Sequence, residues 1–351
     1  MMRFLQCLLI VLGLLWPGSH VTAQTKWQIL EHGDSTVISA HFLPCGKKLV
    51  SASFGGTAIL WNTQTGKPIW KRSFNSHTTK NSYTTSDVLA MELSPDGQTI
   101  AVSYTQGHVI NNRLQKGEED RISLLDSKDG HERKVLIGST ARALRLAFSP
   151  DGHFLATGGP DGKMRLWNIT TGQETKAISL SRGISALSFS PNGKLLVIGQ
   201  AAPTSVKAAD EPDVVVWDVE KQTEINSFQI ESNYVNDVKF APDGKAIAVV
   251  GKVPDEVSLL STANWQRIRS LKNSEVEADR IAFSLKGRLF ASCETGNEGG
   301  RITVWGMAPE VSPSFYDFGD GIESISFSPD ETMLAAGMEH GKILLLRLEI
   351  P

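Results

Sequence analysis

The stretch LRLAFSPDGHFLATGGPDGKMRLWNITTGQETKAI, residues 144–178, contains all the parts of a small antiparallel sheet. Its apolar runs are separated by turn residues, most clearly at Ser149-Pro150-Asp151-Gly152. Pro fixes φ at the second position of a turn, Asp bonds nearby backbone groups, and Gly accepts the positive φ that closes a hairpin. The pattern therefore predicts strands at 144–148, 153–158, 163–168 and 174–178, joined by tight turns.

The same tetrapeptide returns along the chain at intervals of roughly 40 to 55 residues, a period typical of propeller or solenoid units. Copies begin at Leu43, Ser94, Ser149, Ser190, Ala241, Ser284 and Ser328. Each follows an apolar run and precedes another. Seven such units predict an all-β fold, a seven-bladed β-propeller of four-stranded antiparallel blades, as a single domain over residues 24–351.

The two ends of the domain complement each other. The last unit ends with a strand predicted at 344–349, which is only its third. Residues 26–30, Lys-Trp-Gln-Ile-Leu, supply a fourth strand from the N-terminus. Because pairing the two would close the ring and remove an exposed sheet edge, we expect the last blade to be closed by the N-terminal strand.

The third strands carry a resemblance to a known family. Four of them read Leu60-Trp61-Asn62, Leu166-Trp167-Asn168, Val216-Trp217-Asp218 and Val304-Trp305-Gly306. Through these residues and the turn repeat, the chain resembles the WD-repeat β-propeller family over nearly all of residues 24–351. The resemblance implies protein–protein scaffolding. The chain departs from the family in lacking its Gly-His pair before each first strand, so we expect the family's buried hydrogen-bond network to be mostly missing.

The N-terminus has a different character from the repeats. Arg3 precedes an apolar run at 4–16, followed by Pro17-Gly18 and small residues up to Ala23. This pattern is typical of a secretory signal peptide and predicts an exported chain, periplasmic or extracellular, with the signal at 1–23. The alternative is an N-terminal membrane anchor, although a run of about 13 residues is short for a span.

Composition excludes some classes of function. The net charge of −3 and pI near 6.3 argue against a nucleic-acid partner. No pair of His or Cys residues has metal-ligand spacing, and the acidic run at 118–120 lacks the pattern of a calcium loop. We therefore predict no cofactor and no metal. Cys45 and Cys293 fall in blades that are not neighbours, so no disulfide is expected, and the chain is expected to be monomeric on its own.

The antiparallel order divides the connections between two faces of the disc. The turn face carries the repeated tetrapeptides and the short third-to-fourth turns. The loop face carries the second-to-third hairpins and the links between blades. Long segments fall on the loop face, at 75–86, 104–120, 200–212 and 294–300. Loops of this length in a compact fold are usually functional or disordered, so we predict that the loop face recognises a partner.

The candidate partner-binding residues combine aromatic, imidazole, amide and guanidinium groups. They are His77, Tyr83, Tyr104, His108, Asn111 and Arg113 in the first two long segments, and Arg142, Arg182, Tyr234 and Arg280 near the starts of first strands. The leading interpretation is a non-enzymatic scaffold for a protein or peptide partner. The alternative is a lactonase-like propeller hydrolase at the channel mouth, for which the candidates are Arg145, Asp237, Asp279 and Arg280.

Overall fold

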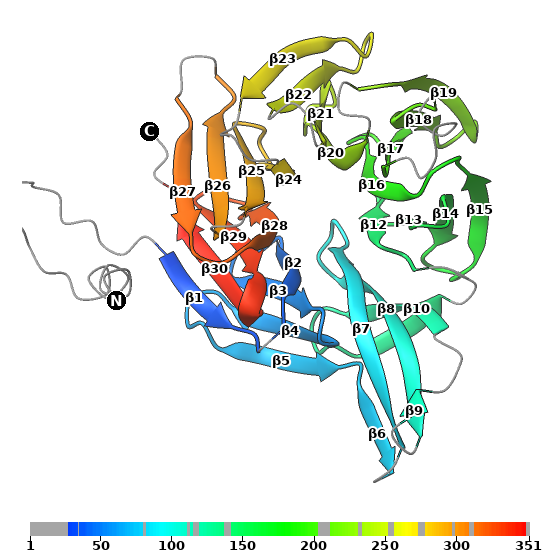
Figure 1. Cartoon of the computed structure of the whole chain (residues 1–351), viewed down its shortest axis with the longest axis vertical. Coiled ribbons are helices and arrows are strands. Elements are labelled where there is room, and N and C mark those ends of the chain that lie inside the picture. The colour runs from blue at the N-terminus through cyan, green and yellow to red at the C-terminus, as the bar shows by residue number, and fades with distance from the viewer. Residues whose placement is uncertain are drawn as a thin grey trace, which may run out of the picture.

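The computed structural model describes residues 27–33, 35–79, 82–110, 113–114, 119–136, 142–202, 211–230, 234–251, 256–272, 278–296, 299–308 and 312–348. Within these ranges the chain forms seven antiparallel sheets arranged as the blades of a ring (Figure 1). Each sheet runs outward from a first strand nearest the axis of the ring to a last strand at the rim. The predicted all-β, seven-bladed propeller is thereby confirmed.

Five blades are four-stranded sheets whose strands follow one another in the chain. Blade 1 contains β2 Val37–Phe42, β3 Lys48–Ser53, β4 Thr57–Asn62 and β5 Pro68–Ser73. Blade 3 contains β12 Arg145–Phe148, β13 Phe154–Gly158, β14 Lys163–Asn168 and β15 Glu174–Ser179. Blade 4 contains β16 Ile184–Phe189, β17 Leu195–Gln200, β18 Val214–Asp218 and β19 Thr223–Phe228. Blade 5 contains β20 Val235–Phe240, β21 Ala246–Gly251, β22 Glu256–Ser261 and β23 Arg267–Lys272. Blade 6 contains β24 Ala278–Phe283, β25 Leu289–Gly296, β26 Gly299–Gly306 and β27 Ser314–Phe318.

Blade 7 is built from both ends of the described chain. Its strands are β28 Ile322–Phe327, β29 Met333–Met338, β30 Lys342–Arg347 and, outermost, β1 Trp27–Glu31. The antiparallel register runs from Trp27 opposite Leu346 to Glu31 opposite Lys342. Leu30 is 2% exposed and packs into the apolar cluster between blades 7 and 1. The prediction that an N-terminal strand closes the last blade is confirmed.

Blade 2 is larger than the others, with six strands. They are β6 Ser76–Thr79, β7 Ser82–Leu93, β8 Thr99–Ile110, β9 Arg113–Leu114, β10 Glu119–Asp126 and β11 Glu132–Leu136. Residues 82–88 of β7 and 104–110 of β8, together with β6 and β9, form what we call the blade 2 arm. In Figure 1, β6 and β9 lie at the end of this arm, beyond the ring.

The prediction that 75–86 and 104–120 are loops was therefore wrong for most of their length. The Thr, Tyr, Val and Ile residues in these segments favour strands once a partner strand is present. The pairing continues to Ser82 opposite Ile110, well past the point where the other blades end. The expected loop at 294–300 is likewise mostly strand, because β25 and β26 pair up to Gly296 opposite Gly299.

The blades pack through apolar clusters, with remnants of a polar network. In blade 1 the Trp61 indole donates to Ser51 Oγ at 2.8 Å, and in blade 3 the Trp167 indole donates to Thr157 Oγ1 at 3.1 Å. Around Trp61, residues such as Phe42 and Leu345 join the neighbouring blades in one buried cluster. Apolar packing thus forms most of the contact between blades.

Candidate interaction surface

The first strands of the blades begin at the loop face, so their first residues line the channel mouth. Four blades place charged side chains there. We call this set the channel-mouth cluster: Arg145, Asp237, Asp279, Arg280 and Glu323. The cluster contains both candidate arginines of the hydrolase interpretation and both candidate carboxylates. Its members interact electrostatically, because the charges of the other members contribute to the pKa shifts of Arg145 and of Glu323.

Arg145 reaches from blade 3 towards blade 4. Its Nε donates to the backbone oxygen of Ser185, and its Nη1 donates to that of Leu144 at 2.8 Å. Burial, and secondarily the like charge of Arg280, lowers the pKa of Arg145 to about 10. The side chain therefore stays protonated near neutral pH and joins two blades at the channel mouth.

The carboxylates of the cluster are held by the protein itself. Asp237 is 7% exposed and accepts hydrogen bonds from the backbone N–H of Val238 at 2.9 Å and of Ile281, in blade 6, at 3.1 Å. Burial raises the pKa of Asp279 and of Glu323. Within the described ranges, no group of three or more His, Cys, Asp or Glu side chains is placed to hold a metal ion. Asp237 therefore joins blade 5 to blade 6 through these hydrogen bonds.

Other polar residues of the channel wall have the same role. Ser39 donates to the backbone oxygen of Met91 at 2.9 Å, which joins blade 1 to blade 2. Asn236 donates to that of Ala278 at 3.2 Å, and Ser326 to that of Ala40 at 2.8 Å. These bonds satisfy groups of the first strands that would otherwise face the channel unpaired.

Two candidate partner-binding residues are buried, which corrects their predicted place on a recognition surface. Tyr104 is 5% exposed; its ring lies 4.6 Å from that of Phe74, because the alternation of β8 turns it into the core. Arg182 is also 5% exposed. Its Nη2 contacts Asp213 Oδ1 at 2.8 Å and donates to the Pro212 backbone oxygen at 2.5 Å, so it holds the end of the 200–212 segment on blade 4.

The other candidates divide between the channel mouth and the blade 2 arm. Arg142 is exposed, and Tyr234 and Arg280 are half-buried, near the starts of their blades. In the arm, the strand register places His77 opposite Tyr83 and Tyr83 opposite Val109, and it places His108 opposite Thr84. Arg113 pairs with Ile110. Asn111, like the acidic run's Glu118, lies outside the described residues.

One notable residue, His32, was missed at the sequence level. It is 3% exposed, its ring centroid lies 6.2 Å from that of Trp61, and Nδ1 lies 3.5 Å from Thr57 Oγ1. Burial lowers its pKa to about 4. The Gly-His pair of the family is absent, yet His32, in the reversed order His32-Gly33, places an imidazole beside the blade 1 Trp. That reversed dipeptide was the available signal.

Comparisons with known proteins agree with this architecture. A family model described as WD domain, G-beta repeat matches residues 24–62 and 128–168. The model described as Eukaryotic translation initiation factor eIF2A matches residues 207–334.

Three similar proteins show the range of relatives. Small ribosomal subunit protein RACK1 of Brassica napus is 31% identical over 99 residues, 28% of this chain and 27% of its own length. Serine-threonine kinase receptor-associated protein of Gallus gallus is 23% identical over 282 residues, covering 75% of this chain and 76% of its own. Protein hir1 of Schizosaccharomyces pombe is 23% identical over 348 residues, covering 90% of this chain and 36% of its own.

These relatives contradict the predicted export. A small ribosomal subunit protein works inside the cell, and the other relatives likewise point away from secretion. The prediction of an exported chain was therefore wrong. A charged residue, a short apolar run and small residues make a weak compositional signal, and residues 1–26 lie outside the described ranges. In the described part of the chain, no helix is long and apolar enough to cross a membrane.

Proposed function

Because the chain belongs to the WD-repeat β-propeller family, we propose that it is a non-enzymatic scaffold that binds a protein partner through its loop face. A closed ring of packed blades is rigid, and irregular segments mounted on it can be held in place for recognition. The WD-repeat relatives support an interaction scaffold as the general class. The loop face is the finer part of the proposal.

The blade 2 arm is the observation that carries this proposal. Among the described residues it adds strands to blade 2 alone, and it extends the end of β7 and β8 that belongs to the loop face. Across the arm, the register places His77, Tyr83 and Val109 in one row, which Leu114 continues on β9. Tyrosine is among the residue types enriched at the centres of protein interfaces. We assign the arm as the first contact with the partner.

The exposed and half-exposed candidates at the channel mouth form the second part of the proposed surface. Arg142, Tyr234 and Arg280 come from blades 3, 5 and 6, so a partner that contacts them lies over the channel. Arg280 Nη1 donates to the backbone oxygen of Asp279 at 2.9 Å, which fixes the guanidinium near the mouth. Preorganised side chains of this kind lose little conformational freedom on binding.

Truncation of the arm tests the proposal. The variant replaces residues 76–84 and 107–118 by short Gly-Ser linkers and so ends the arm at the row of Ser86, Gln106 and Glu119. The matched control replaces residues 203–210, which lie in the sequence between β17 and β18 of blade 4. Partners captured from a lysate of the source cells are quantified and then tested pairwise as purified proteins.

We expect the truncated arm to lose at least one partner that both the parent and the blade 4 control retain. Thermal melting followed by circular dichroism shows whether each variant keeps the ring. If a folded truncation binds every purified partner as tightly as the parent does, the arm is not the recognition element.

A further inference from the structure

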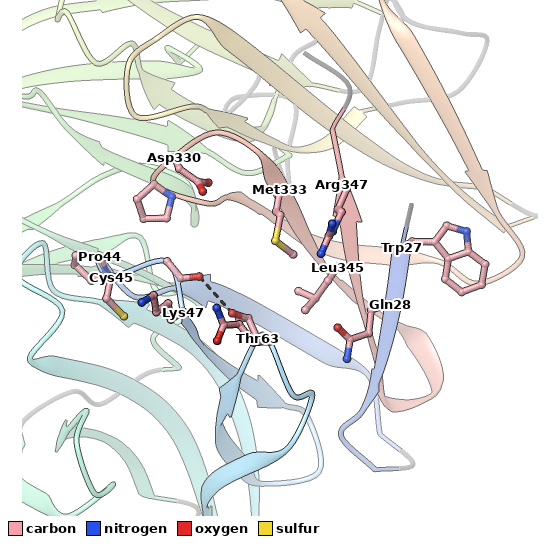
Figure 2. Close-up of a pocket in the computed structure, with 13 residues that line it drawn as sticks. Trp27, Gln28, Pro44, Cys45, Lys47, Thr63, Asp330, Met333, Leu345 and Arg347 are labelled. Carbon is pink, nitrogen blue, oxygen red and sulfur yellow. Dashed lines mark hydrogen bonds between the residues drawn. The ribbon is translucent and has the colours of Figure 1, made fainter. Parts of the chain in front are cut away.

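A groove of about 1070 Å³ lies on the turn face, where blade 7 meets blade 1 (Figure 2). The sequence predicts a uniformly tight turn face, and the groove departs from that expectation. The groove lies at the place where the ring closes. In blade 1, residues 63–67 join β4 to β5, whereas in blade 7 the outermost strand β1 comes from the other end of the chain. Within the described residues, β30 and its outer neighbour β1 are therefore not joined by a turn of this kind.

One side of the groove is a face of the blade 7 sheet. Met333 of β29 pairs with Arg347 of β30, and Leu345 of β30 pairs with Gln28 of β1, so these four side chains share that face. Met333 packs against the buried cluster that contains Leu345, which makes the floor of the groove apolar. Figure 2 shows Arg347 and Met333 directed towards the turns of blade 1, while Trp27 points outward.

The opposite side comes from the turns of blade 1. Cys45 and Lys47 belong to the first turn, and Thr63, whose hydroxyl donates to the backbone oxygen of Gly46 at 3.3 Å, begins the second. Cys45 is a free, exposed thiol. The groove therefore has an apolar floor between two polar walls, one from each blade.

The charge of the lining is opposite to that of the whole chain. Lys47 and Arg347 are exposed cations from the two walls, and neither forms an ion pair within the described ranges. The one acidic lining residue, Asp330, accepts hydrogen bonds from Ser328 Oγ at 2.6 Å and the Thr332 N–H at 3.1 Å. Since the chain carries a net charge of −3, the groove is a local basic site on an acidic molecule.

We propose that this groove binds an extended acidic peptide segment of a partner protein. Apolar side chains of the segment rest on the partly buried Met333, which covers Leu345, and its carboxylates pair with Lys47 and Arg347. An Arg can hold a carboxylate through two parallel hydrogen bonds. The volume lies just above the roughly 300–1,000 Å³ of small-molecule sites, which suits several residues of peptide. The site is separate from the loop face and does not depend on the function proposed for that face.

Cys45 provides a reporter inside the groove. The alkylation rate of Cys45 by N-ethylmaleimide is followed by mass spectrometry of the peptide that contains it, in the full-length protein. Cys293 is fully buried and serves as an internal reference. The probes are two synthetic heptapeptides, Glu-Leu-Glu-Leu-Glu-Leu-Glu and its Lys-Leu counterpart. We expect the acidic peptide to slow alkylation of Cys45 in a saturable way and the basic peptide to leave it unchanged.

Charge reversal identifies the residues responsible. The double variant Lys47→Glu, Arg347→Glu should raise the half-protecting concentration of the acidic peptide by about tenfold or more. Lys194→Glu is the matched control, because Lys194 is exposed and occupies the same turn position in blade 4. If the double variant melts at a lower temperature than the parent, Lys47→Ala alone is used instead. We expect it to raise the half-protecting concentration of the acidic peptide by a smaller factor. Equal protection by both peptides, no protection by either, or equal loss in the Lys194 variant overturns the proposal.

Discussion

At the scale of the residue, His32 shows how burial sets a chemical property. Its ring is almost fully buried beside Trp61, and Nε2 has no hydrogen-bond partner in the described structure. Protonation would place an uncompensated charge in the interface between blades 7 and 1. The neutral imidazole is therefore the form that the folded state requires.

This burial predicts an acid-sensitive stability. Burial lowers the pKa of His32 from 6.5 to about 4, so between these values the unfolded state binds more protons than the folded state. Its stabilising contribution is complete above pH 6.5 and is lost as the pH falls towards 4, by about 3 kcal/mol. Urea unfolding of the parent and of His32→Gln at pH 7.5, 5.5 and 4.5 measures this difference. Parallel pH profiles for the two proteins would contradict the assignment.

At the scale of the element, the turns were predictable and the arm was not. The strand predicted at 163–168 matches β14 Lys163–Asn168, because Pro, Asp and Gly specify a turn through contacts within a few residues. The strands of the arm depend on pairing between segments distant in the chain. Tyr104 illustrates the consequence: its place in the sequence suggested a loop, whereas the alternation of β8 directs it inward.

The first turns of blades 6 and 7 each depart from the repeat at one position, and the two departures compensate for each other. Glu331 stands where the other turns have Gly, keeps a left-handed φ of 67°, and is fully buried. Its carboxylate accepts hydrogen bonds from the N–H of Lys286 at 2.9 Å and from Arg288 Nε at 2.7 Å, both in blade 6. Blade 6 has the exposed Leu285 where other turns have Pro. A Pro there would occupy space near the carboxylate, as Pro44 does near Gly97.

We expect Glu331→Ala to destabilise the protein by about 1–3 kcal/mol, because it removes a buried carboxylate that accepts two partly buried hydrogen bonds and keeps the strained φ. Glu331→Gly should be less harmful by about 1 kcal/mol, since Gly adopts this φ without strain. Urea unfolding measures both, with Glu220→Ala, an exposed residue of a blade 4 turn, as the control. Equal stability of the Ala variant and the parent would show that the contact between blades 6 and 7 contributes nothing.

At the scale of the whole molecule, the repeat count predicts the ring, whereas the sites depend on contacts that the repeat does not encode. The channel-mouth cluster joins residues of blades 3, 5, 6 and 7, which the sequence separates by up to 178 positions, from Arg145 to Glu323. The groove between blades 7 and 1 follows from the predicted closure. It could not be located from the sequence, because its lining depends on which faces of β29 and β30 remain uncovered.

Closure by β1 makes the stability of every blade depend on five N-terminal residues. Deletion of residues 24–31 removes the pairing from Trp27 to Glu31, exposes the edge of β30 and leaves a cavity where Leu30 was buried. Loss of one buried Leu alone costs about 2–5 kcal/mol, which corresponds to at least about 3 °C in melting temperature for a domain of this size. The control is a chain that lacks only residues 1–23 and keeps β1. Differential scanning calorimetry should show a single transition for both, at lower temperature for the deletion, because a ring without its closing strand loses contacts in blades 7 and 1 together. Equal melting temperatures would mean that blade 7 is stable with three strands and that β1 is not needed for closure.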